Sequence, residues 1–184
     1  MLIVWIIVIL VVLVIGYAVI TYNGLVSMRN RIENAWAQID VQLTRRSDLI
    51  PNLVETVKGY AAHERETLDA VIRARNAAIA APNTPGAQAE ADGALAASLK
   101  QVFALSEAYP DLKANTNFLA LQEELTATEG RVSYARQFYN DSVLNYNNKL
   151  QQFPTMIFAN ILKFQKREYF EADPASREVP RVQF

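Results

Sequence analysis

The sequence contains no cysteine and a single histidine, His63. Disulfide bonds, thiolate catalysis, cysteine-ligated zinc and acylation at an N-terminal cysteine are therefore excluded. One histidine forms neither an HExxH zinc motif nor the paired Glu-x-x-His motifs of di-iron bundles within one chain. Glycine-rich phosphate loops and nucleophile elbows are also absent. We therefore predict no cofactor, no metal and no enzymatic activity.

A dominant charge of one sign is missing as well. The chain has 18 Lys and Arg residues against 19 Asp and Glu residues, and the two signs are interleaved along it. Nucleic-acid binding would require a concentrated basic surface, so we predict none. Carboxylates alone serve many hydrolases, but acids such as Glu123 and Glu124 fall at helix positions that suit a solvated surface.

Charged side chains are absent before Arg29, and this N-terminal segment is the clearest physical signal. From Leu2 to Ile15 every side chain except Trp5 is Leu, Ile or Val. Such a run favours membrane insertion by about 4 to 8 kcal/mol, and its length matches the roughly 20 residues that cross a hydrocarbon core. A cleaved signal peptide would need a basic n-region and a small-residue cleavage site. We predict instead a transmembrane anchor at 1–22.

The charges that flank this segment predict its orientation. Only the terminal amine precedes it, whereas four arginines follow it: Arg29, Arg31, Arg45 and Arg46. The positive-inside rule then places the following domain in the cytoplasm of a single-pass inner-membrane protein. A periplasmic domain is the alternative.

The rest of the chain has the periodicity of amphipathic helices and no strand pattern. An apolar stripe with spacings of three and four follows the anchor; it consists of Leu25, Met28, Ile32, Ala35 and Ile39. We expect the transmembrane and first soluble helices to form one rod to about Arg46. A new helix should then begin, because Asp48 can cap it and Pro51 is tolerated in a first turn.

Three further features complete the predicted architecture. The stretch 81–86 is the strongest helix breaker, a third helix stops before Pro110, and a fourth runs from Asn115 or Thr116 to Leu150. The fold class is therefore all-α, with an N-terminal transmembrane helix continuing into an antiparallel bundle of about four long helices at 23–170. An extended C-terminal tail is expected at 171–184.

The apolar segment 153–164 is too short for a second membrane span. It is also too apolar all round for a helix with one wet face. Two alternatives remain for it: packing inside the bundle, or contact with the membrane interface or another subunit.

The stretch RRSDLIPNLVETVKGYAAHE, at 45–64, resembles the signature of the LemA family of bacterial membrane-associated proteins. The similarity continues upstream through YNGLVSMRNRIENAWAQIDVQL and downstream to FPTMIFANILKF and the closing PRVQF. The resemblance implies an N-terminal anchor, a bundle of long helices and no established enzymatic activity. Some relatives are linked to magnetosome membrane formation. Others carry a lipoprotein-type cysteine, which would place the domain outside the cytoplasm.

The signature supplies the candidate interaction or structural residues: Arg45, Arg46, Asp48, Pro51, Asn52, Lys58, His63 and Glu64. Without the family, the two arginines complement the carbonyl groups of a helix C-terminus and Asp48 complements the amide groups of the next N-terminus. The alternative to this helix corner is a partner-docking surface made by Arg45, Arg46, Asp48, Asn52 and Lys58. His63 is expected to be a partly exposed helix residue, with a proton-linked switch or an intersubunit metal ligand as alternatives.

These observations favour binding or assembly over catalysis. We predict a non-catalytic protein that self-assembles or scaffolds at the bacterial cell membrane and organises or remodels it. Its partners would be lipid and further copies of the chain, which would meet through the anchor and the stripe that continues it, with the segment 153–164 as a second surface. An accessory subunit of a membrane protease or signalling complex, bound to another membrane protein, is the alternative. A carboxylate-dependent hydrolase is the least favoured hypothesis.

Overall fold

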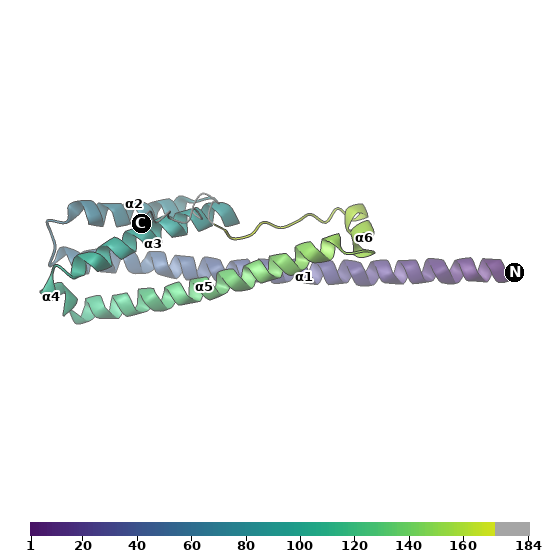
Figure 1. Cartoon of the computed structure of the whole chain (residues 1–184), viewed down its shortest axis with the longest axis horizontal. Helices are drawn as coiled ribbons and strands as arrows, with labels where there is room; N and C mark the ends of the chain where they lie inside the picture. Colours follow the sequence, from purple (N-terminus) through teal and green to yellow (C-terminus); the bar gives the residue numbers. More distant parts are fainter. Residues whose placement is uncertain (172–184) are drawn as a thin grey trace, which may run out of the picture. The chain divides into compact units, whose positions relative to one another are not determined.

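The computed structural model describes residues 1–171, which form six α-helices and no strand (Figure 1). The helices are α1 (Leu2–Lys58), α2 (Arg65–Ala80), α3 (Pro85–Ser106), α4 (Pro110–Lys113), α5 (Thr116–Gln151) and α6 (Thr155–Ile161). The predicted all-α fold with a long apolar N-terminal helix is confirmed. The predicted tail lies outside the described residues from position 172 onward.

The helices divide into two compact units. The first unit combines Met1–Ala37 with Phe138–Glu168, and the second combines Gln38–Gln137 with the segment that begins at Tyr169. The helices α1 and α5 contribute to both units, α6 belongs to the first, and α2 to α4 belong to the second. The predicted boundary between membrane anchor and soluble bundle at 22/23 stays a prediction.

In the first unit, α1 packs against the C-terminal part of α5. The indole of Trp36 and the ring of Tyr139 have centroids 5.6 Å apart. The chain that follows α6 returns to α5, where the Asn147 side chain donates to the Arg167 carbonyl and accepts from the Arg167 amide, both at 2.9 Å. The Tyr139 hydroxyl donates to the Glu168 carbonyl at 2.9 Å. These polar contacts fix the segment that leaves α6.

The second unit has its own apolar core, contributed by α1 to α5. Its buried residues are Ile50, Leu53, Val54, Val57, Ala61, Leu68, Val71, Leu95, Leu99, Val102, Leu112, Phe118 and Leu125. Within this unit α2 and α3 lie side by side. Most of the predicted apolar faces are buried as expected, but Tyr60 is 43% exposed and its hydroxyl accepts a hydrogen bond from Asn115 at 2.8 Å.

The predicted helix end near Arg46 is wrong, because α1 continues to Lys58 with Pro51 inside it. A proline in a helix interior has no N–H to donate to the carbonyl four residues earlier, here that of Ser47. The Arg75 Nε of α2 donates to this Ser47 oxygen at 2.8 Å. A tertiary hydrogen bond thus satisfies the acceptor that proline leaves free. The helix ends instead before Gly59, and a turn precedes α2.

Candidate membrane contact and interaction sites

Among residues 1–171, only α1 is long and apolar enough to cross a membrane, and its apolar window is not buried by protein. Ile3 is 73% exposed, Ile9 57% and Ile15 58%. Side chains of this kind normally fill a core, and a continuous exposed set of them marks a surface that lipid or another protein covers. This surface is the candidate membrane-contact site of the first unit.

The segment 153–164 proves to be partly packed and partly exposed. Within α6 only Thr155 and Ala159 are buried. The Tyr17 hydroxyl lies 3.4 Å from Thr155 Oγ1, and the Tyr17 and Phe158 ring centroids are 5.5 Å apart. One side of α6 therefore packs on α1, which leaves its other large apolar side chains outside the core.

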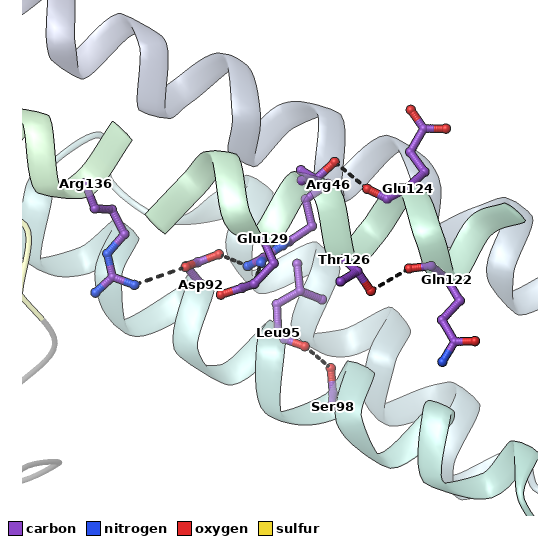
Figure 2. Close-up of polar contacts among 10 residues, drawn as sticks. Arg46, Asp92, Leu95, Ser98, Gln122, Glu124, Thr126, Glu129 and Arg136 are labelled. Atoms are coloured by element: carbon purple, nitrogen blue, oxygen red, sulfur yellow. Dashed lines mark hydrogen bonds and ion pairs between the residues drawn. The ribbon is translucent and has the colours of Figure 1, made fainter. Parts of the chain in front are cut away.

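The best defined polar site of the second unit is a cluster of ion pairs around Arg46 (Figure 2). The Arg46 guanidinium, which is 2% exposed, pairs with Asp92 of α3 and Glu129 of α5. The other Asp92 oxygen lies 3.9 Å from Arg136 Nη1, and the Arg136 guanidinium stacks 4.8 Å above the Phe170 ring. Two cations and two anions thus join α1, α3, α5 and the segment after α6. We call these four charged residues the Arg46 cluster.

Buried charges of this kind are stable only when each is paired. Removing one partner leaves an uncompensated charge in a medium that solvates it poorly. The Arg46 cluster is therefore a structural element, and Arg46 cannot belong to an exposed docking surface as the sequence suggested. The predicted role for Arg46 at a helix C-terminus is also wrong, since the residue lies within α1.

The other signature residues are spread over the surface of the second unit. Arg45 pairs with Glu124 of α5. Glu124 and Asn52 both line a groove of about 450 Å³ between α1 and α5. Asp48 lies in the middle of α1 with an exposed side chain. It therefore has no free helix N-terminus to cap. It lines a separate pocket of about 280 Å³ together with Arg46 and Asp92.

Three signature residues lie at or beyond the C-terminal end of α1. Lys58 is exposed and pairs with Glu55 at 3.9 Å. His63 is exposed in the turn that follows α1, not in a helix. Glu64, just before α2, accepts a hydrogen bond from the Tyr109 hydroxyl at 3.0 Å. This bond, burial and the Glu64 charge raise the pKa of Tyr109 above its ordinary value of 10.0.

Sequence reasoning missed the partners of Arg46. Asp92 follows Ala89 by three residues and precedes Leu95 by three, so it lies on the buried face of α3. A carboxylate within an apolar helical stripe was the available signal, because such a position requires a cation nearby. Glu129 and Arg136 had no comparable signal in the sequence. Among residues 1–171 no group of His, Asp and Glu has the arrangement of a metal site.

The N-terminal part of α1 is apolar and exposed, and the helices that follow bury an apolar core and an ion-pair cluster. These features define a membrane-associated helical protein. The LemA family model matches residues 35–184. The chain therefore belongs to the LemA family.

Three curated relatives show the range of the family. The chain is 25% identical over 179 residues to magnetosome protein MamQ 2 of Paramagnetospirillum magneticum, an alignment that covers 84% of this chain and 66% of the relative. The same identity and coverage hold for magnetosome protein MamQ of Magnetospirillum gryphiswaldense. The chain is also 26% identical over 158 residues to protein LemA of Metamycoplasma hominis, an alignment that covers 84% of this chain and 71% of the relative. The chain thus spans just under two thirds of the MamQ proteins.

Proposed function

We propose that this protein is a non-catalytic membrane scaffold, anchored by the N-terminal part of α1, whose copies associate in the plane of the bacterial cell membrane and organise or remodel it. The observation that carries the proposal is the exposed apolar surface of α1, which requires lipid or a second copy as cover. Similarity to magnetosome proteins supports a role in organising a membrane.

We propose a smaller surface for self-association than the one expected from the sequence, which included the stripe as well as the anchor. Four residues of the predicted stripe are at most 3% exposed: Leu25, Ile32, Ala35 and Ile39. They fill the cores of their own units and are not available to a second copy. We therefore propose that association uses the transmembrane part of α1, where Gly16 has open space on the side that a Cβ would occupy. Close helix approach at small residues stabilises contacts in lipid.

Confinement to a membrane makes such weak contacts effective, because it raises the local concentration of the chains. Full-length protein in mild detergent or native lipid should therefore be multimeric by light scattering. Protein that lacks residues 1–22 should be mostly monomeric. A full-length monomer in both settings would refute self-assembly.

The contact itself can be tested at one residue. Gly16→Leu should lower the multimer fraction several-fold, because the larger side chain prevents close approach of two helices. Gly24→Leu is the matched control, since Gly24 is also an open glycine of α1 but lies beyond the predicted anchor. Loss with Gly24→Leu but not with Gly16→Leu would locate the contact outside the anchor.

The orientation is a second part of the proposal. Arg45 and Arg46 pair with acids of the second unit, whereas the first unit carries Arg29 and Arg31 on α1. It also carries the basic residues Lys149, Lys163, Lys166 and Arg167. Lysine and arginine close to a span favour the cytoplasmic side. We propose that the second unit, and the part of the first unit that follows the anchor, lie in the cytoplasm.

An accessory subunit of a membrane complex is the second candidate function. The groove between α1 and α5 of the second unit favours it, because this groove combines polar side chains with Ala120 and Leu121. A partner seated there should co-purify in fixed ratio after gentle extraction and be lost in Ala120→Arg. The exposed Ala127 of the same helix provides the control, Ala127→Arg.

A further inference from the structure

The helix α6 lies beside the end of the predicted membrane span, not beside its middle (Figure 1). Its first turn contacts Tyr17 through Thr155 and Phe158. The residue Phe164, just after α6, contacts Tyr22 with ring centroids 5.8 Å apart. Because all these residues belong to the first unit, the position of α6 along α1 is defined.

This position corresponds to a definite depth in a bilayer. A helix that rises 1.5 Å per residue from Leu2 crosses a hydrocarbon core of about 30 Å near Tyr22. Tyr17 then lies about 7.5 Å inside that limit. Interfacial helices are buried about 5–10 Å at the boundary between headgroups and acyl chains. The segment from Thr155 to Phe164 thus lies at interfacial depth.

The outer side of this segment is apolar. We define the α6 apolar surface as Phe153, Met156, Ile157, Ile161 and Leu162. Phe153 is 79% exposed and Ile161 70%, while the other three are 42–45% exposed. Residues at the same level of the span are also exposed, with Val19 at 54% and Ile20 at 73%. The α6 apolar surface therefore lies at a level of α1 where other apolar side chains are exposed as well.

A basic groove adjoins this surface on the side away from the span. It has a volume of about 310 Å³, and its lining includes four cations, namely Arg29, Lys163, Lys166 and Arg167, beside Tyr22, Tyr146, Leu162, Phe164 and Gln165. Arg29 Nε is buried without a hydrogen-bond partner. One acid lies close, since Glu33 Oε1 is 3.9 Å from Arg29 Nε and 3.3 Å from Arg167 Nη2. The lining itself contains no carboxylate.

Lys163 connects the two features. It has a left-handed backbone with φ of 56° and donates its amide hydrogen to the Asn160 carbonyl at 3.2 Å. This turn ends α6 and directs Lys166 and Arg167 into the groove. Cations therefore lie at the depth where phosphate groups begin, directly beyond the apolar side chains.

We propose that α6 is an interfacial membrane helix, whose apolar surface inserts among the lipids of the leaflet from which α1 emerges while the basic groove binds the phosphates of anionic phospholipids. The position beside the exposed span argues for lipid as the occupant, and the lysines and arginines argue for an anionic headgroup. The inference rests on membrane anchoring by α1 but not on self-assembly.

The absence of cysteine allows a direct test, because one introduced cysteine can be labelled uniquely in the full-length chain. In the variant Ile161→Cys, the introduced cysteine is labelled with an environment-sensitive fluorophore. The labelled protein is then placed in lipid nanodiscs that hold one chain each. Quenchers attached to lipids near the headgroup should quench this label, and aqueous iodide should not. Tyr134→Cys, at a residue 72% exposed in the second unit, should show the opposite pattern. A label at residue 161 that behaves like the one at 134 overturns the proposal.

A second arm tests the headgroup. Adding phosphatidylglycerol to phosphatidylcholine discs should increase lipid quenching at residue 161 several-fold. The double variant Lys163→Gln, Lys166→Gln should abolish this increase. Lys58→Gln with Lys100→Gln removes the same charge from exposed positions of the second unit and should preserve it. No response to phosphatidylglycerol, or an equal loss in both double variants, refutes headgroup binding.

Single-chain discs also separate this proposal from the scaffold. Protection from iodide that is seen only with two chains per disc, without quenching by lipid, would mean that another copy covers α6 and would overturn the lipid assignment. Multimeric protein in native lipid with an iodide-accessible residue 161 would leave self-assembly intact and refute only the interfacial helix.

Discussion

Arg75 Nε donates a hydrogen bond of 2.8 Å to the carbonyl oxygen of Ser47, 28 residues earlier in the chain. Pro51 leaves this carbonyl without its helical donor. The contact explains how α1 passes through a proline without ending, and it couples α2 to the interior of α1. Both residues belong to the second unit.

Arg75→Met should destabilise the protein by about 1–3 kcal/mol, because a partly buried carbonyl loses its only specific donor. In a Pro51→Ala background the same substitution should cost less, since an alanine at that position supplies the missing N–H. Urea unfolding of full-length protein in detergent, followed by circular dichroism, measures both values. Arg73→Met, at an exposed position of α2, is the control. Equal costs of Arg75→Met in the two backgrounds would rule out this coupling.

Arg46→Met should cost about 3–5 kcal/mol, because it leaves the buried Asp92 without its main cation. The neighbouring Arg45→Met removes an exposed pair with Glu124 and should cost about 0–1 kcal/mol. The difference between the two unfolding midpoints checks the burial of the Arg46 cluster. Similar midpoints would mean that Arg46 is solvated.

Asp48→Ala should change stability by less than about 0.5 kcal/mol, because an exposed helix-interior acid has no cap to lose. The N-cap that the structure does show is Asn115, whose Oδ1 accepts from the Phe118 amide at 3.0 Å. Asn115→Ala should therefore cost about 0.5–2 kcal/mol. Tyr60→Phe separates the cap from the second Asn115 contact, since it removes only the bond to the Tyr60 hydroxyl. A larger effect at Asp48 than at Asn115 would restore the helix corner.

Stability should fall at alkaline pH through three tyrosines. The hydrogen bond to Glu64 raises the pKa of Tyr109, and burial raises the pKa values of Tyr139 and Tyr146. A raised tyrosine pKa means that folding favours the neutral phenol. This contribution is complete below about pH 10 and is lost as the pH rises through the folded-state pKa. Tyr139→Phe should reduce the pH dependence of the urea midpoint above about pH 10, and an unchanged slope would contradict the assignment.

The orientation can be measured in cells with a single cysteine. Tyr134→Cys should resist a membrane-impermeant maleimide in intact spheroplasts and react after lysis, because the second unit, which contains this residue, is proposed to be cytoplasmic. A periplasmic cysteine in a known membrane protein shows that the reagent has access. Labelling of residue 134 before lysis would reverse the orientation.

Much of the fold followed from local patterns. The apolar run at Leu2–Ile15 predicts a span because its length and lack of charge are sufficient evidence. The stripe from Leu25 to Ile39 predicts a buried face for the same kind of reason, since helical periodicity alone places those residues together. The breaker at 81–86 and the helix start at Asn115 or Thr116 likewise depend on neighbouring residues.

The errors came from positions where distant residues decide the outcome. Pro51 and Asp48 together are a good helix-start signal, but Arg75 supplies a donor that no local pattern reveals. Arg46 resembles an exposed cation until Asp92 and Glu129 are brought to it by α3 and α5. The element that the stripe packs against also depended on tertiary structure. Periodicity predicts an apolar helix face but does not specify which segment or chain covers it.

By itself the sequence determined the helical class, the apolar N-terminal segment and the family, because hydropathy, periodicity and the 45–64 signature are properties of contiguous residues. Only the tertiary structure decided that the stripe is internal, that Arg46 lies in a buried ion-pair cluster, and that α6 lies beside Tyr17 and Tyr22 with its apolar side chains outward. Each of these outcomes depends on contacts between segments far apart in the chain. The energy of such a contact cannot be predicted from the sequence of either segment alone.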